Sequence, residues 1–263
     1  MKRFGLYSVL FIACLMVVAP YFMMIVCSFS TSASIKANNF FSDLSFSNFI
    51  INFESAIHQK NFFRSILNSL IVSSISSLMG AFWASLAVYS YNFNSSKLLS
   101  FLLLITIIPM YIPTASILIP IFLMFRYINL NDTYFSLIVT SMNIPFLVFL
   151  IQQNAKNFSK DVIKAARKDG ANEFRIYYRI FIPGMKTVFI TAIIFSFFEA
   201  WNSVLIPVVL LQSPDKFTNS ILLNSIGSIW YSDYAMLMMS LVLSTLPTFL
   251  IFVIFRYYLK KHD

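Results

Sequence analysis

Long apolar segments dominate the sequence and limit what the chain can fold into. A helix needs roughly 20 apolar residues to cross a hydrocarbon layer of about 30 Å. The segments that reach this length are residues 7–27, 65–91, 98–125, 134–153, 186–211 and 234–258. With 59% hydrophobic and only 11% charged residues among 263, a soluble core could not absorb the apolar surface. We therefore predict an all-α integral membrane protein, with six transmembrane helices in a single transmembrane domain over residues 1–263.

The distribution of basic residues predicts the orientation, because Lys and Arg near span ends are retained in the cytoplasm. With both termini in the cytoplasm, all but five of the 19 Lys and Arg residues lie on the inner side. The five on the outer side are Lys36, Lys60, Arg64, Arg126 and Lys216. Membrane topology therefore explains the basic excess, which gives no support to nucleic-acid binding.

The longest inner loop lies between the fourth and fifth spans and has a helical pattern. Ser159 is placed to cap a first helix with its side-chain oxygen, and Gly170 to end it, since glycine readily adopts positive φ. Asn172 is placed to cap a second helix, which Pro183 follows before the next span. Four aromatic residues recur in this second helix at i, i+3, i+4 and i+7 and predict one apolar face: Phe174, Tyr177, Tyr178 and Phe181.

Two functions could use this helix pair. One is a membrane-surface element, with its aromatic rings among lipid headgroups and its cations facing anionic lipid. The other is a docking surface for a cytoplasmic protein, in which Ala165 and Ala166 allow close approach and the charges set the fit. Periodicity alone does not decide between them.

The order of residues in this loop resembles the coupling-loop signature of ABC importer permeases, in which EAA is followed by a glycine and by I-x-x-P. Here AA-x-x-DGA and I-x-x-P are formed by Ala165, Ala166, Asp169, Gly170, Ala171, Ile180 and Pro183. We call residues 159–183 the coupling loop. The resemblance implies contact with an ATPase subunit through Lys164, Ala165, Ala166, Asp169, Gly170, Ala171, Phe174, Tyr177 and Pro183.

The resemblance extends to other spans. NSLIV at 68–72, LAVYSY at 86–91, IIPMYIPTASILIPIF at 107–122 and FFEAWNSVLIP at 197–207 are similar to spans of carbohydrate importer permeases of the maltose-permease type. That family implies import of a sugar or oligosaccharide by alternating access across the bacterial cytoplasmic (inner) membrane. It also implies a second permease, commonly as a heterodimer, two cytoplasmic ATPase subunits and an extracytoplasmic solute-binding protein. A permease for a non-sugar solute is the alternative within the family.

Two positions depart from the family pattern. Lys164 stands where the family commonly has Glu, and Ser159 where a Pro often precedes the helix. A reversed charge at a docking surface changes which partner fits, because like charges brought together cost free energy. Either the ATPase carries a compensating acidic residue, or the contact at Lys164 is not retained.

The chain has no chemistry of its own that would make it an enzyme. None of its five glycines belongs to G-x-x-x-x-G-K-[ST], so we expect this chain to bind no cofactor, with ATP and Mg²⁺ on the partner ATPase. Cys14 and Cys27 both lie in the first apolar segment and indicate no disulfide framework. His58 and His262 lie far apart, so no metal site is expected.

Candidate residues of a solute pathway lie in the fourth and fifth spans. Glu199 is the one acidic residue within the predicted spans, where a charge costs about 2.5–3.5 kcal/mol on insertion scales and needs a partner or a wet cavity. Trp201 and Asn202 supply an aromatic face and an amide that suit a sugar, although they could equally serve helix packing. Asn143 is a weaker candidate. A hydrogen bond between helices or subunits is the alternative role for Glu199.

Two other classes of membrane protein fit the sequence less well. An ion-coupled secondary transporter usually carries several intramembrane ionisable groups and repeated halves, whereas these spans show one acid and no repeat. A membrane-embedded enzyme would need converging acids, histidines or a nucleophile with a base, and no such cluster is present in the sequence.

Overall fold

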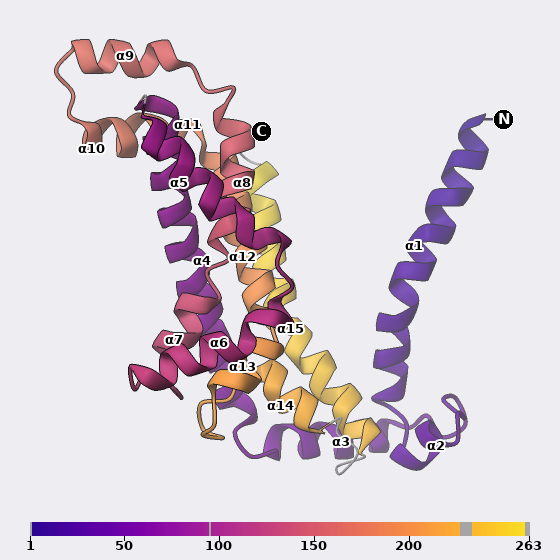
Figure 1. Ribbon diagram of the computed structural model, residues 1–263. Helices are drawn as coiled ribbons and strands as arrows, with labels where there is room; N and C mark the ends of the chain where they lie inside the picture. Colours follow the sequence, from indigo (N-terminus) through magenta and orange to yellow (C-terminus); the bar gives the residue numbers. More distant parts are fainter. Residues whose placement is uncertain (1, 95, 227–232, 261–263) are drawn as a thin grey trace. The chain divides into compact units, whose positions relative to one another are not determined.

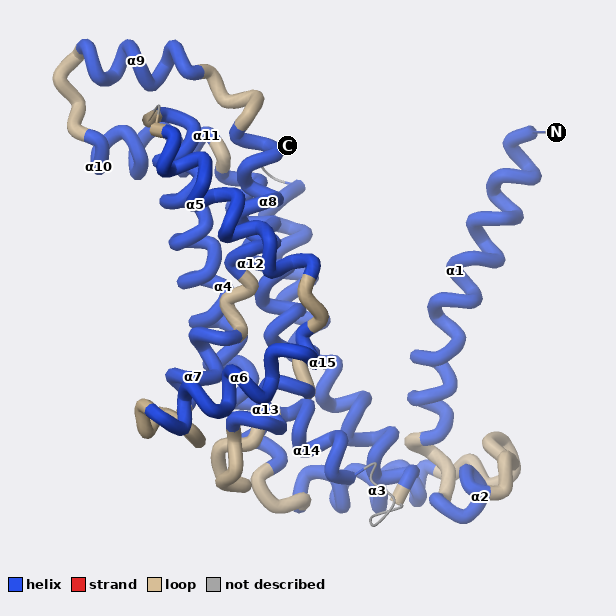
Figure 2. The backbone as a smooth tube through the Cα atoms, viewed as in Figure 1, coloured by secondary structure: helices blue, strands red, loops and turns tan. Residues whose placement is uncertain are grey.

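Helix is the only regular secondary structure in the part of the chain that the computed structural model describes, residues 2–94, 96–226 and 233–260 (Figure 1, Figure 2). The longer helices are α1 (Lys2–Cys27), α3 (Phe46–His58), α4 (Phe62–Phe93), α5 (Lys97–Ile107), α6 (Thr114–Tyr127), α8 (Ile144–Ala155), α12 (Lys186–Asn202) and α15 (Tyr234–Lys260). The shorter ones are α2 (Ser32–Lys36), the 3₁₀-helix η1 (Ile108–Tyr111), α7 (Tyr134–Thr140), α9 (Lys160–Lys168), α10 (Glu173–Ile176), the π-helix η2 (Tyr177–Phe181), α11 (Ile182–Gly184), α13 (Leu205–Leu210) and α14 (Asn219–Ile226).

The expected all-helical architecture is confirmed. Within the described residues, four helical segments are long and apolar enough to cross a membrane: Leu6–Cys27, Phe62–Phe93, Tyr134–Ala155 and Tyr234–Tyr257. Two bent helix pairs, Lys97–Tyr111 with Thr114–Tyr127 and Glu173–Gly184 with Lys186–Asn202, raise the number to six if each pair is one span.

The third predicted span, 98–125, is strongly bent. Its two halves, α5 with η1 and then α6, differ in direction by 112°. Pro109 removes one backbone N–H from the helix, and Pro113 forces the preceding Ile112 into an extended conformation, with ψ of 123°. Pro109 and Pro113 therefore coincide with a complete break of this span, whereas Pro120 lies within α6.

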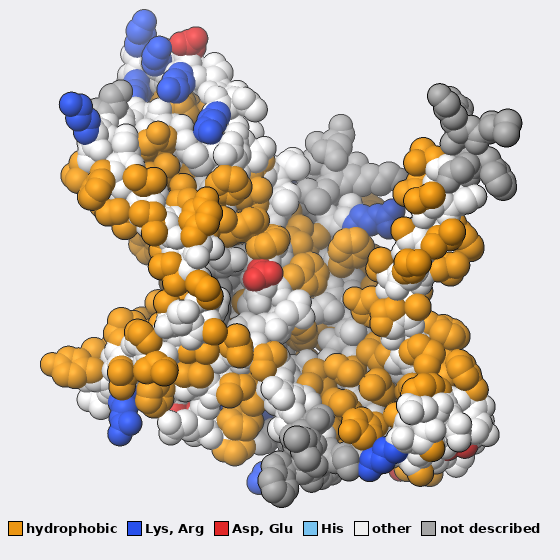
Figure 3. Space-filling model, turned by 45° about the vertical axis from the view of Figure 1, so that its right-hand side comes forward, with side chains coloured by type: hydrophobic (Ala, Val, Ile, Leu, Met, Phe, Trp, Pro, Cys, Tyr) orange, Lys and Arg blue, Asp and Glu red, His pale blue; other side chains and the backbone are white. Residues whose placement is uncertain are grey.

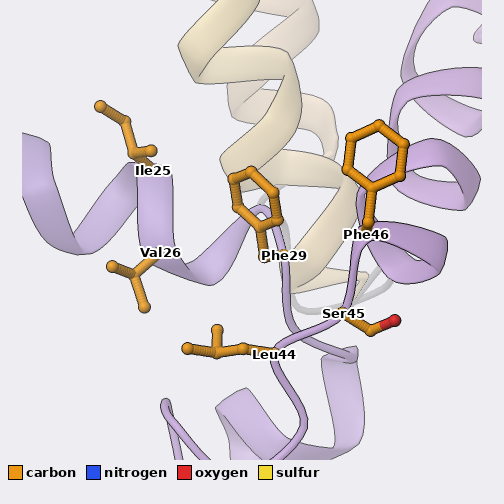
Figure 4. A pocket seen from close by; sticks show the side chains of 6 residues that line it. All are labelled: Ile25, Val26, Phe29, Leu44, Ser45 and Phe46. Carbon is orange, nitrogen blue, oxygen red and sulfur yellow. The ribbon is translucent and has the colours of Figure 1, made fainter.

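The chain divides into two compact units. Unit 1 comprises residues 1–66 and 221–252, and unit 2 comprises residues 67–220 and 253–263. Among the described residues, the main core of unit 1 gathers around Ala56, Phe62 and Met239. Only 6% of the apolar window of α1 is buried. Near the end of α1, a hollow of about 230 Å³ is bounded by Ile25, Val26, Phe29, Leu44, Ser45 and Phe46 (Figure 4).

Unit 2 contains the larger core and both candidate sites. Helix α8 of this unit packs against α5 and α12. The buried side chains of the unit 2 core include Val88, Leu147, Ile151 and Phe181. Figure 1 shows α9 and α10 at one end of this unit and α6, α7 and α13 at the other. The coupling loop and the far end of the unit are thus separated by the length of α12.

Gly80 allows α4 to approach the break between α7 and α8. A Cβ atom added to Gly80 would lie 2.3 Å from the carbonyl oxygen of Met142 and 3.1 Å from the Leu147 side chain. Because real Cβ atoms do not come so close to a backbone oxygen, a larger residue would push the two elements apart. This glycine therefore sets the contact distance at the centre of unit 2.

Asp132 joins two loops at the end of unit 2 opposite the coupling loop. Its carboxylate accepts hydrogen bonds from the backbone N–H groups of Gln212 and Ser213 at 2.9 and 3.1 Å. The same carboxylate accepts from Lys216 Nζ at 2.9 Å. Against the opposing effect of burial, hydrogen bonds from Ser213, Gln212 and Lys216 hold the pKa of Asp132 well below its usual range.

We predict that Gly80→Ala lowers the thermal stability of the purified protein. Overpacking of a tight contact costs about 1–3 kcal/mol, so the melting temperature in detergent should fall by several degrees. Ala87→Val is the matched control, since it enlarges an exposed position on the same helix. Equal melting temperatures for Gly80→Ala and the wild type would contradict the close contact.

We predict that Asp132→Asn destabilises the protein only where the native carboxylate is charged. A lowered folded-state pKa contributes stability that is present above the unfolded-state pKa, about 3.9, and is lost as the pH falls through the folded-state pKa. The difference in melting temperature between wild type and variant should therefore stay constant from about pH 8 to pH 5 and shrink below about pH 4. A difference that grows on acidification would contradict this assignment.

Candidate functional site

The coupling loop begins and turns largely as its sequence predicts. Gly170 adopts φ of +79° directly after α9, as expected for a glycine that ends a helix. Asn172 caps α10, because its Oδ1 accepts a hydrogen bond from the backbone N–H of Arg175 at 2.8 Å. Ser159 occupies the cap position of α9, but its side chain makes no capping hydrogen bond, so that detail of the prediction is wrong.

The predicted single aromatic face of the second helix is also wrong. The segment turns into the π-helix η2, whose wider turns change the direction in which successive side chains point. Tyr177 and Phe181 are buried and stack on one another, whereas Phe174 and Tyr178 are exposed and pack together with ring centroids 4.6 Å apart. The four rings therefore form an inner pair that fixes the loop and an outer pair that faces away from the unit.

An ion pair closes the coupling loop and attaches it to α4. Arg167 donates to both carboxylate oxygens of Glu173, from Nε at 2.7 Å and from Nη2 at 3.1 Å. Its Nη1 also donates to the carbonyl oxygen of Phe93, the last residue of α4, at 3.1 Å. The Tyr89 hydroxyl donates to Glu173 at 2.6 Å. Such a bidentate pair fixes direction as well as distance, so α9, α10 and the end of α4 are held together.

The electrostatics of Glu173 agree with this geometry. Hydrogen bonds from Arg167, and then from Tyr89, lower the pKa of the Glu173 carboxyl against the opposing effect of burial. A further contact joins the π-helix to α4, because the hydroxyls of Tyr177 and Ser85 lie 2.6 Å apart. The loop is therefore attached to α4 at two levels of the helix.

The predicted ATPase-contact residues divide into an outer and an inner set. Six are exposed in this chain: Lys164, Ala165, Asp169, Gly170, Phe174 and Pro183. Ala166 and Ala171 are half-buried against the core, and Tyr177 lies within it at 3% exposure. Figure 3 shows Lys and Arg side chains gathered at the end of unit 2 that carries α9. The Ile163 side chain of α9 is buried in the core of unit 2, at 1% exposure.

Lys164 has a local charge partner. Its Nζ lies 3.3 Å from Asp161 Oδ1, one turn earlier on α9, with both side chains mostly exposed. An exposed pair of this kind contributes little to stability. The unusual lysine is therefore presented at the surface with an acidic neighbour beside it.

A cavity of about 650 Å³ forms the second candidate site, where three helix breaks meet. The first break lies between η1 and α6, the second between α7 and α8, and the third between α12 and α13. Asn143 stands at the second break in the left-handed conformation, with φ of 47°. Non-helical backbone at membrane depth is tolerated where it lines a cavity, and this cavity supplies that setting.

Three of the four predicted solute-pathway residues line this cavity together. Asn143, Glu199 and Asn202 belong to its wall, although they come from two different spans. Trp201 does not line it: the side chain is 6% exposed and stacks on Phe197, with ring centroids 5.9 Å apart. Sequence reasoning also missed the hydroxyl side chains of the wall, which include Thr140, Ser141 and Ser203. Pro113 and Pro145, at two of the breaks, were the available signal.

Among the residues that the structure describes, no group of three His, Cys, Asp or Glu side chains could hold a metal ion.

Comparison with known proteins places these features in a family. Residues 76–262 match the family described as the inner membrane component of binding-protein-dependent transport systems. The lactose transport system permease LacG of Rhizobium radiobacter is 27% identical, with 94% of this chain and 89% of that protein covered. The arabinooligosaccharides transport system permease AraQ of Bacillus subtilis is 32% identical, with 82% and 75% covered. A bacterial ABC transporter involved in alginate import has the same fold, with a TM-score of 0.81 at 21% identity over 98% of this chain and 96% of that chain.

We predict that Glu173→Gln loosens the coupling loop. The substitution removes the charge that Arg167 and Tyr89 hold but leaves every Lys and Arg in place, so trypsin cleavage sites do not change. Cleavage between α9 and α10 in the purified protein should become at least about threefold faster, as expected when a charge-assisted hydrogen bond worth about 1.5–3 kcal/mol is weakened. Asp161→Asn, which breaks the exposed pair with Lys164, is the control. Equal cleavage of the two variants would contradict a closing role for Glu173.

Proposed function

Because the chain belongs to the family of inner membrane components of binding-protein-dependent transport systems, we propose that it is the permease subunit of an ATP-driven sugar importer. The solute would be a sugar or oligosaccharide, as the names of its relatives LacG and AraQ indicate for those proteins. The observation that carries the proposal is the coupling loop, which is rigidly attached to α4 and presents an outer surface. ATP hydrolysis belongs to a separate subunit.

The proposed assembly contains this chain, a second permease subunit, two cytoplasmic ATPase subunits and an extracytoplasmic solute-binding protein. ATP and Mg²⁺ would bind to the ATPases. In this assembly the chain crosses the bacterial inner membrane six times, with both termini and the coupling loop in the cytoplasm, as the distribution of Lys and Arg supports. The bent pair Lys97–Tyr111 with Thr114–Tyr127, and the helix Lys186–Asn202 of the second pair, supply the two further spans.

The transport mechanism that we propose is alternating access. When the ATPases close on ATP, the surface around α9 and Phe174 moves with them. The Arg167–Glu173 pair and the Tyr177–Ser85 hydrogen bond pass this displacement to α4 instead of letting the loop bend. At the other end of α12, the cavity with Asn143, Glu199 and Asn202 would open to one side of the membrane and then to the other.

The Lys164–Asp161 pair offers a physical account of the departure from the family's Glu. Lys164 brings a positive charge to the docking surface, and Asp161 keeps a negative charge on the same turn. An ATPase groove that receives this surface would need an acidic group opposite Lys164, because an unpaired buried charge is costly. The opposing ATPase residue is therefore a site where a compensating charge is expected.

We predict that Phe174→Ala uncouples the permease from its ATPase. Phe174 is 71% exposed, and among the described residues its ring contacts one other aromatic ring, that of Tyr178. Truncation of Phe174 should therefore leave the fold intact. Loss of an aromatic anchor at an interface costs about 2 kcal/mol or more. ATPase co-purification and ATP-dependent sugar uptake in proteoliposomes should therefore fall at least tenfold, by the conversion of about 1.4 kcal/mol per factor of ten.

Tyr127→Ala is the matched control for this experiment. Tyr127 is an even more exposed aromatic residue, at 88% exposure, and it lies at the end of α6, away from the coupling loop. Its truncation should leave co-purification and uptake near the wild-type level. Uptake by the wild-type complex that is driven by an ion gradient without ATP would contradict the proposed function itself.

A further inference from the structure

We infer that Glu199 makes the cavity of unit 2 a charge filter that admits uncharged sugars and disfavours anionic ones such as uronic acids. This inference rests on the proposed sugar-import function and assigns the chemical class of the solute. The cavity wall contains one ionisable side chain among its described residues, and that side chain is Glu199.

The Glu199 carboxylate is available to a solute. It is exposed, and it forms no hydrogen bond or ion pair with any other residue in the described ranges. A carboxylate without a partner at membrane depth costs free energy unless water or a solute reaches it. The cavity provides that access, so packing between helices of this chain is not the role that the geometry supports.

Helix stability does not explain the position of Glu199 either. It lies in the last turn of α12, which ends at Asn202. A helix C-terminus carries a partial negative charge, so an acidic residue there is unfavourable by about 0.3–1 kcal/mol. A residue that opposes both the membrane and the helix dipole needs another function, and the cavity is the site that it faces.

The remaining polar groups of the wall suit a neutral polyhydroxyl solute. Asn143 and Asn202 each present one acceptor and two donors, and the carboxylate of Glu199 accepts from hydroxyl donors. Ser141, at 8% exposure, belongs to the wall, and its buried hydroxyl oxygen has no hydrogen-bond partner among the described residues. An anionic sugar would meet the Glu199 charge with no described cation in the wall to offset it.

The electrostatic potential of the cavity can be measured without knowing the sugar. The experiment uses the purified transporter complex in proteoliposomes, with Cys14→Ser and Cys27→Ser, and introduces Ser203→Cys as a nearly isosteric reporter in the cavity wall. The probes are two methanethiosulfonates of similar size, the cationic trimethylammonioethyl and the anionic sulfonatoethyl compound. The ratio of their reaction rates reports the local charge.

We predict that the reporter reacts faster with the cationic probe, and that Glu199→Gln lowers the cation-to-anion rate ratio at least about fivefold, as expected for a unit charge a few ångströms away at an effective dielectric of about 20. Glu199→Asp should keep most of the preference. A control reporter, Tyr127→Cys, lies outside the cavity wall. Its rate ratio should be the same in the protein with Glu199 and in the Glu199→Gln variant.

Two results would overturn the inference. One is a ratio at Ser203→Cys that does not change in Glu199→Gln. The other is a failure of both probes to react at Ser203→Cys and at a second reporter, Thr140→Cys, because a cavity closed to small ions offers no route for a sugar. Neither result depends on uptake, so the inference can fail while ATP-dependent sugar import by the wild-type complex still stands.

Discussion

The satisfaction of backbone hydrogen bonds in an apolar chain is the constraint on which the rest of the structure depends. Lipid offers no partner for a free backbone N–H or C=O group, so the long apolar segments of the described chain are helical. The helix breaks are the exceptions, and three of them meet at a single cavity. The non-helical backbone at these breaks therefore lies where water or a polar solute can reach it.

In the proposed mechanism the coupling loop meets a different requirement, since a surface that transmits force must not bend. Without side-chain contacts, the corner that Gly170 forms between the short helices α9 and α10 would be free to open. The bidentate Arg167–Glu173 pair closes that corner, and its contact with the Phe93 carbonyl places the corner on the end of α4. Tyr89 contributes from within α4 to the same carboxylate. A neutral side chain at Glu173 would keep the shape of the corner and lose its stiffness.

Local signals predicted much of this structure, and long-range packing decided the rest. The positive φ of Gly170 and the cap at Asn172 follow from residues within a few positions, so the sequence was sufficient. The π-helix at Tyr177 was not predictable by periodicity, because it depends on ring packing against α4 and α8. The prolines marked where the third span bends but not by how much. The pairing of Asn143 with Glu199 in one cavity came from tertiary structure, as did the burial of Trp201.

The continuity of α12 gives a physical link between the two sites. This helix has 17 residues without proline, begins three residues after the end of the coupling loop and ends at the cavity with Glu199 in its last turn. At about 1.5 Å per residue it spans about 25 Å, so a small tilt imposed at Lys186 becomes a larger displacement at Glu199. The break at Ser203 then separates α12 from α13, which lets the Glu199 wall move relative to the wall that α13 forms. In the proposed mechanism, a helix that runs unbroken from Lys186 to the cavity is thus suited to convert a displacement at the coupling loop into a change of solute access.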